Sequence, residues 1–250
     1  MKSSHKLAFL LVLIGFQLNV DSLQAQLFDA LKKKANSLLK GESSIGGFTE
    51  QEAVSALKEA LQNGITKGTN EVSKQDGYFG NQFIKIPFPQ EARDIESTLR
   101  KVGMGKTVDD AVLSLNRAAE DAATKALPIF VDAITTMSFQ DAIGIVKGDD
   151  SIAGTRFLQQ STTLALTKAF RPVIEGSLDK VDATKHWSTV MNAYNKIPFV
   201  KKINPDLTQY VTEKALEGLF FTIASEEKLI RKDPLGQASA LLRKVFGGKL

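Results

Sequence analysis

The sequence predicts an all-α fold: a single multi-helix bundle of about eight helices with two short extended, proline-containing segments. Apolar residues recur at the three- and four-residue spacing of amphipathic helices, as in Val54, Leu57 and Leu61. Strand-like alternation never exceeds about four residues. The two expected extended segments, 83–89 and 197–205, each contain two prolines, which disfavour helix there.

Composition narrows the classes of function. The 250 residues are 43% hydrophobic and 24% charged, which is typical of a globular protein. The 32 basic residues are interspersed with 28 acidic ones, so we expect no nucleic-acid partner. Without cysteine, the chain has no disulfide, thiolate nucleophile or sulfur ligand. The two histidines lie in no metal-binding motif, and we expect neither a metal nor a cofactor.

Residues 1–25 have the features of a secretory signal peptide. Lys2 and Lys6 precede the apolar run from Leu7 to Leu18, which is shorter than the ~20 residues of a membrane span. Cleavage is expected after Ala25. We therefore expect an exported protein of a Gram-negative bacterium, either periplasmic or secreted. The alternative is an uncleaved membrane anchor.

Residues 26–48 are expected to be a weakly ordered helix and linker. Residues 26–40 are lysine-rich with leucines at helical spacing, and glycine and serine follow in 41–48. We favour a frayed arm over the alternative, a weak contact of residues 26–40 with an anionic membrane surface.

A helical domain is expected over 49–247. Thr49 and Glu52 have the spacing of a capping box, and the first helix should end before the turn-rich stretch 74–81. Further helices are expected at 90–102, 107–127, 129–136 and 138–147, followed by 150–180, 184–195, a central apolar helix at 208–231 and a last helix that ends at Gly247. Thr107, Ser138, Asp150 and either Asp206 or Thr208 are the expected caps.

The tetrapeptide KIPF occurs twice, at 85–88 within the first extended segment and at 196–199 at the start of the second. Extended backbone inside a helical domain needs hydrogen-bond partners. We therefore expect Ile86 and Ile197 to lie side by side.

Several short strings carry a resemblance to a known family. They are SKQDGY (73–78), IKIP (84–87), NRAAE (116–120), PIF (128–130), YNKIPF (194–199), NPDL (204–207), YVT (210–212) and ALEGLF (215–220). In this order the chain resembles the exported bacterial family called domain of unknown function 4197. The resemblance implies a helical envelope protein with a signal peptide. It implies no activity and no catalytic residue.

The first candidate site is the polar group Asn116, Arg117 and Glu120. Asn116 and Glu120 share a line of their helix with two leucines, so this line should be at least partly buried. Buried polar groups need partners, and Arg117 is three residues from Glu120. We expect one hydrogen-bonded cluster, either a polar ligand pocket or, as we favour, a structural clasp for a proline-containing loop.

The second candidate is a loop containing Asp76, Tyr78 and Asn81. Polar and aromatic loop residues on a rigid scaffold often bind ligands. The Asp76-Gly77 pair is also simply a turn signal, and we favour that interpretation.

No catalytic residue is expected. The chain lacks G-x-S-x-G, H-E-x-x-H and P-loop motifs. His186 is expected to pack beside Trp187, and Glu213 and Glu217 are expected on a solvated face. Glu227 and Arg231 have the spacing of an ordinary surface ion pair.

We therefore expect a non-catalytic helical module of the envelope that binds an unknown ligand, lipid or protein in a groove near the Asp76–Asn81 and KIPF loops. Two alternatives remain. One is a hydrolase or lyase that uses carboxylates and Arg117, and the other is a purely structural interaction protein.

Overall fold

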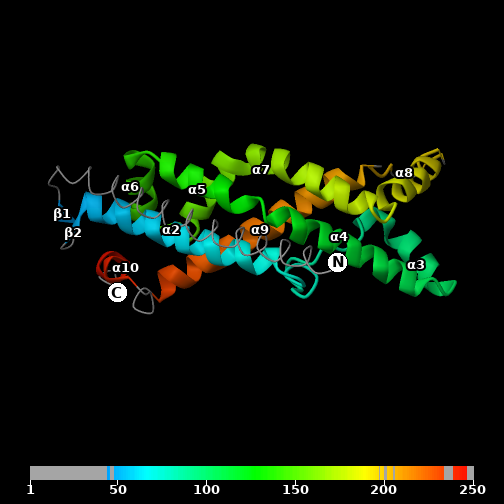
Figure 1. Ribbon diagram of the computed structural model, residues 1–250, viewed down its shortest axis with the longest axis horizontal. Helices are drawn as coiled ribbons and strands as arrows, with labels where there is room; N and C mark the ends of the chain where they lie inside the picture. Colours follow the sequence, from blue (N-terminus) through cyan, green and yellow to red (C-terminus); the bar gives the residue numbers. More distant parts are fainter. Residues whose placement is uncertain are drawn as a thin grey trace, which may run out of the picture. The chain divides into compact units, whose positions relative to one another are not determined.

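The structure is a computed structural model that describes residues 44–45, 48–196, 198–199, 202–204, 206–233 and 239–246 (Figure 1). The expected all-α class is confirmed, because helices dominate these residues. The expected signal peptide and the helix at 26–40 lie outside them. Contacts divide the chain into two units, residues 1–55 and 56–250, which are described separately.

The first unit contains a short antiparallel ribbon and a helix start. Strands β1 (Ser44–Ile45) and β2 (Phe48–Thr49) pair in a region that was expected to be only a linker. The expected capping box then begins α2 (Glu50–Ser73): Thr49 N donates to Glu52 Oε2 at 2.9 Å, and Glu52 N donates to Thr49 Oγ1 at 3.1 Å.

The second unit contains the rest of α2 and all later helices. After the loop 74–89 come the short 3₁₀ helix η1 (Gln90–Ala92) and helix α3 (Arg93–Lys101). The remaining helices are α4 (Gly105–Ala123), α5 (Ala126–Thr136), α6 (Phe139–Lys147), α7 (Ala153–Asp179), α8 (Ala183–Tyr194), α9 (Leu207–Lys232) and α10 (Ala240–Phe246).

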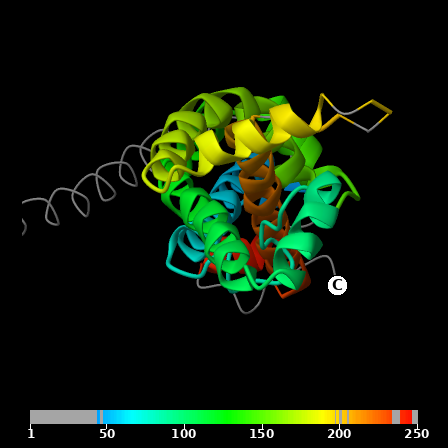
Figure 2. The ribbon, with the colours of Figure 1, turned by 90° about the vertical axis from the view of Figure 1, so that its right-hand side faces the viewer.

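Helix α9 is central in the second unit, as its apolar composition predicted. It packs against α4, α7 and α8, and Figure 2 shows it among the other helices when viewed from one end. Its fully buried residues Val211, Ala215 and Leu219 follow one another at four-residue spacing. The partner α7 contributes Leu166 and Phe170, both with no exposed surface. This interior positions the loop 74–89, which packs against α4 and α9.

Besides the capping box of Thr49, two predicted helix caps are confirmed and two are wrong. Ser138 accepts from Asp141 N, and Asp206 accepts from Gln209 N. Helix α4 begins two residues earlier than expected, so Thr107 lies within its first turn. Asp150 does not cap α7: the residue before that helix is Ile152, which makes no side-chain capping bond.

Both proline-containing segments differ in part from the expectation. In the first, Phe83 and Ile84 belong to a turn, and only residues 85–89 are neither helix, strand nor turn. In the second segment Pro198 and Phe199 form a turn, with Phe199 at φ 64°. Ile197 lies outside the described residues, so the expected proximity of Ile86 and Ile197 stays a prediction.

Asparagine side chains bind the backbone of both proline-containing segments. Asn116 Oδ1 accepts from Ile86 N at 2.8 Å, and its Nδ2 donates to Ile86 O at 2.9 Å. Asn195 makes the same two bonds to Ile203, at 2.8 and 2.7 Å. Each segment thus finds partners for these backbone groups without its twin, because a side-chain amide carries one donor group and one acceptor.

No single described helix is long and apolar enough to cross a membrane. Helices α5 and α6 reach that length and composition only as a pair, and they are bent by 98° between them.

Candidate functional site

The loop that follows α2 turns sharply where Asp-Gly predicted a turn. Asp76 has φ 65°, a left-handed conformation that aspartate tolerates. A Cβ on Gly77 would lie 2.5 Å from Glu71 O and 2.6 Å from Val72 O. Only glycine therefore fits at 77, and the chain reverses directly over the end of α2.

Glu120 of α4 holds this loop. Its side chain is buried, with the residue 3% exposed. Oε1 accepts from the backbone amides of Tyr78 and Phe79, both at 3.1 Å, and Oε2 accepts from Arg117 Nη1 at 2.6 Å. Arg117 Nη2 also binds Asp76 Oδ1 at 2.7 Å. The hydrogen bond to Glu120, followed by that to Asp76, raises the pKa of Arg117.

Asn116 forms a separate set of bonds, one turn away on the same helix. It is fully buried, and besides its two bonds to Ile86 it donates to Val112 O at 2.8 Å. The expectation of one cluster is thus correct for Arg117 and Glu120, whereas Asn116 is bonded elsewhere. Both sets nonetheless hold the same loop, at residues 78–79 and at residue 86.

Tyr78 anchors the loop to α9. Its ring has no exposed surface, and its hydroxyl donates to Ala215 O at 2.6 Å. A Cβ on Gly218 would lie 2.6 Å from Tyr78 Cε1, so this glycine makes room for the ring. Burial, and secondarily the charge of Glu120, raise the pKa of Tyr78 far above its ordinary value. The hydroxyl therefore remains a protonated donor.

Asn81 is a turn residue. Its Oδ1 accepts from Phe83 N at 3.0 Å, two residues along the chain. The structure thus brings Asp76 and Tyr78 to the Arg117–Glu120 pair, and leaves Asn81 with a local role.

A second buried glutamate was missed. Glu227 of α9 is 7% exposed and accepts from Gly154 N at 3.0 Å and from both Thr155 N and Thr155 Oγ1 at 2.7 Å. It therefore caps α7 from a neighbouring helix, and its bond to Arg231 belongs to this buried group rather than to an ordinary surface pair. A signal was present, because Glu227 shares the helix stripe of Ile223 and Ile230.

Glu120 and Glu227 are built alike. Each buried carboxylate binds two consecutive backbone amides and one arginine of its own helix. All of these bonds are internal to the protein. Neither glutamate is therefore free to act on a substrate as an acid or base.

The other candidate catalytic groups are on the surface. His186, Glu213 and Glu217 are all exposed. Within the described ranges, no group of three or more histidine, aspartate or glutamate residues has a geometry that could hold a metal ion.

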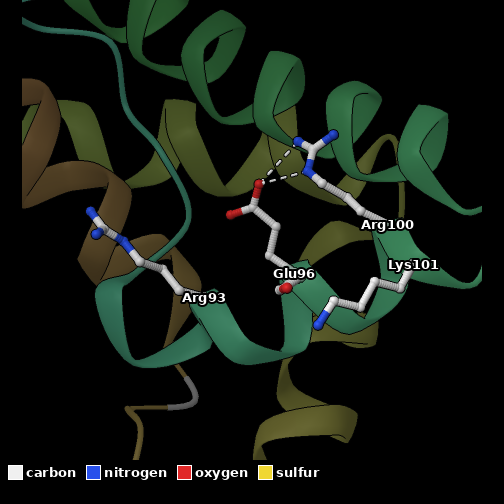
Figure 3. Close-up of a pocket in the computed structure, with 5 residues that line it drawn as sticks. Arg93, Glu96, Arg100 and Lys101 are labelled. Carbon is white, nitrogen blue, oxygen red and sulfur yellow. Dashed lines mark hydrogen bonds and ion pairs between the residues drawn. The ribbon is translucent and has the colours of Figure 1, made fainter.

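A shallow depression of about 510 Å³ lies along α3 (Figure 3). Glu96 and Arg100 are paired there at 3.0 Å, and Arg93 and Lys101 extend from the same helix on either side. All of its lining residues come from 93–101, and a single helix does not enclose a substrate.

An exposed aromatic pair joins the anchored loop to α9. The rings of Phe83 and Phe221 stack with centroids 6.1 Å apart, although these residues are 73% and 48% exposed. Nearby in the loop, Lys85 Nζ lies 3.9 Å from the ring centre of Phe79. We call Phe83 and Phe221 the aromatic pair.

Comparison with known proteins supports the resemblance in sequence. The family model described as "Protein of unknown function (DUF4197)" matches residues 47–247. No curated protein and no solved structure matches the chain.

Proposed function

The chain belongs to the family described as "Protein of unknown function (DUF4197)", and we propose that it is an exported, non-catalytic module of the bacterial envelope that binds a partner through its aromatic pair. The observation that carries this proposal is an exposed Phe83 in a loop that buried polar bonds hold in place.

The proposal that the module is non-catalytic rests on the hydrogen bonds that its buried polar groups already make. A carboxylate-dependent hydrolase needs an acid that faces a substrate cleft. Glu120 instead accepts from a backbone amide of the loop, and Glu227 accepts from a backbone amide of α7. The hydroxyl of Tyr78 donates to Ala215 O. These contacts support the interpretation of the polar residues as a structural clasp rather than as a ligand pocket.

The binding part rests on rigidity and exposure together. The loop is bound at residues 78, 79 and 86 by side chains of α4, and by Tyr78 at α9. An exposed side chain on a rigid loop loses little entropy when it binds. Exposed aromatic residues are also enriched where proteins meet partners.

The export part rests on the N-terminal sequence, with its basic start, twelve-residue apolar run and Ala25. Mass spectrometry of the protein from fractionated cells tests it. We expect a mature chain that begins at Gln26 in the envelope or the medium. Recovery from the cytoplasm with Leu7 to Leu18 intact would contradict export.

Binding is tested by placing a photo-crosslinking amino acid at position 83 in growing cells. The control is position 164, because Leu164 of α7 is 70% exposed, close to the 73% of Phe83. We expect a crosslinked product, either protein or lipid, from 83 and not from 164. Equal crosslinking from both positions, or none from either, would contradict a binding role for the aromatic pair.

A further inference from the structure

We propose that the partner of the aromatic pair is the anionic surface of a lipid bilayer, which the protein contacts with the outer face of α9. This inference rests on the proposed binding function and names its partner. The outer face consists of Phe221, Ser225, Lys228 and Lys232 of α9, together with Phe83, which stacks on Phe221.

These α9 residues share one side of the helix. At about 100° per residue, Ser225, Lys228 and Lys232 all lie within about 40° of Phe221. Leu229, 53% exposed, lies at the edge of the face, about 80° away. The face therefore combines exposed apolar side chains with lysines along several turns, which is the composition of a helix that lies on a membrane surface.

The lysines of this face are available to an anionic partner. Lys228 and Lys232 are exposed, and neither pairs with a carboxylate in the part of the chain that the structure describes. The acid nearest to this face along α9 is Glu217, one turn before Phe221, and it is already paired with Lys214. Lipid phosphates would therefore meet unpaired cations.

The type of cation favours a bilayer over a protein. Protein interfaces are enriched in arginine and depleted in lysine, whereas basic clusters that bind anionic lipids use either residue. A second copy of this chain is disfavoured, because Lys228 and Lys232 would face the same positive charges across a twofold axis. The small apolar cleft between α2 and α9, lined by Gly64, Ile223 and Ile230 among others, lies on the opposite side of α9.

The test is flotation of the mature chain, residues 26–250, with vesicles of phosphatidylglycerol and phosphatidylcholine, or of phosphatidylcholine alone. All variants keep the same N-terminus, so they differ only in the face. We expect binding to the anionic vesicles that weakens with added salt. Loss of a lysine should weaken it about fivefold, so Lys228→Ala with Lys232→Ala should weaken it about 25-fold. Phe83→Ser with Phe221→Ser should weaken it at least about tenfold.

The matched control is Leu164→Ser with Lys168→Ala, an exposed apolar residue and a lysine one turn apart on α7. We expect this control to bind like the unaltered chain. Equal binding to both kinds of vesicle, equal loss in the control, or no difference between the face variants and the unaltered chain would overturn the bilayer proposal.

The crosslinking experiment separates the two proposals. A protein crosslinked at position 83, in a chain that does not bind anionic vesicles, would overturn the bilayer as partner and leave the binding surface standing. Absence of both vesicle binding and crosslinking would overturn both. Melting temperatures of the variants should match that of the unaltered chain, because every altered side chain is exposed.

Discussion

Replacement of Glu120 by alanine should destabilise the second unit strongly. The change leaves the amides of Tyr78 and Phe79 without their acceptor and removes the partner of Arg117 Nη1. Each stranded amide costs about 1 kcal/mol or more. The side chain of Arg117 is 33% exposed and keeps Asp76, so its loss is smaller than the ~3–5 kcal/mol of a fully buried pair. We expect a total loss of about 3 kcal/mol.

Thermal unfolding followed by circular dichroism measures this loss. For a unit of this size, about 3 kcal/mol should lower the melting temperature by about 6–12 °C. The control is Asp76→Asn, which removes the exposed ion pair with Arg117, keeps a residue that tolerates the left-handed backbone, and should cost less than about 1 kcal/mol. Equal melting temperatures for Glu120→Ala and the unaltered chain would refute the clasp. A drop in Asp76→Asn as large as in Glu120→Ala would place the stabilisation elsewhere.

Three further changes test other parts of the structure. Glu227→Ala removes the cap of α7 and should lower the free energy of unfolding by about 3 kcal/mol. Amide hydrogen exchange should then speed up most in the first turn of α7. Unchanged exchange in that turn would contradict the cap. Gly218→Ala puts a methyl group 2.6 Å from Tyr78 Cε1 and should cost about 1–3 kcal/mol in urea unfolding; full stability would mean that the ring has room to move. Burial alone would raise the pKa of Asp206, but the bonds from Arg171 and the Gln209 amide outweigh it and lower that pKa below 3.8. The stabilisation by Asp206 is therefore complete above pH 3.8 and is lost as the pH falls through the lower pKa of the folded state. Asp206→Asn should therefore make the free energy of unfolding depend less on pH in the acid range. An unchanged pH dependence there would argue against this ion pair.

Local patterns in the sequence were enough to predict most helices and several of their ends. The capping box of Thr49 and Glu52, and the caps Ser138 and Asp206, depend on atoms a few residues apart, which a sequence displays directly. The cap of α7 comes from Glu227, more than seventy residues along the chain, and was missed. Asp150 was the nearest candidate in sequence, but its Oδ1 accepts from Ile152 N instead.

The candidate site likewise has a part that local spacing predicted and a part that it did not. Helical spacing predicted that Asn116 and Glu120 lie on a covered line and that Arg117 reaches Glu120. Local spacing did not predict which backbone groups these side chains bind, because that depends on the path of the loop. Gly77 turns the chain so that two successive amides face the carboxylate of Glu120.

The sequence by itself determined the helical class, the family and the burial of the polar line on α4, because periodicity and short motifs are local properties of the chain. Only the tertiary structure decided that Asn116 binds Ile86, that Glu227 caps α7 and that Phe83 stacks on an exposed Phe221. The physical reason is that a buried donor or acceptor takes whichever partner the packing brings within about 3 Å, and packing depends on all helices at once.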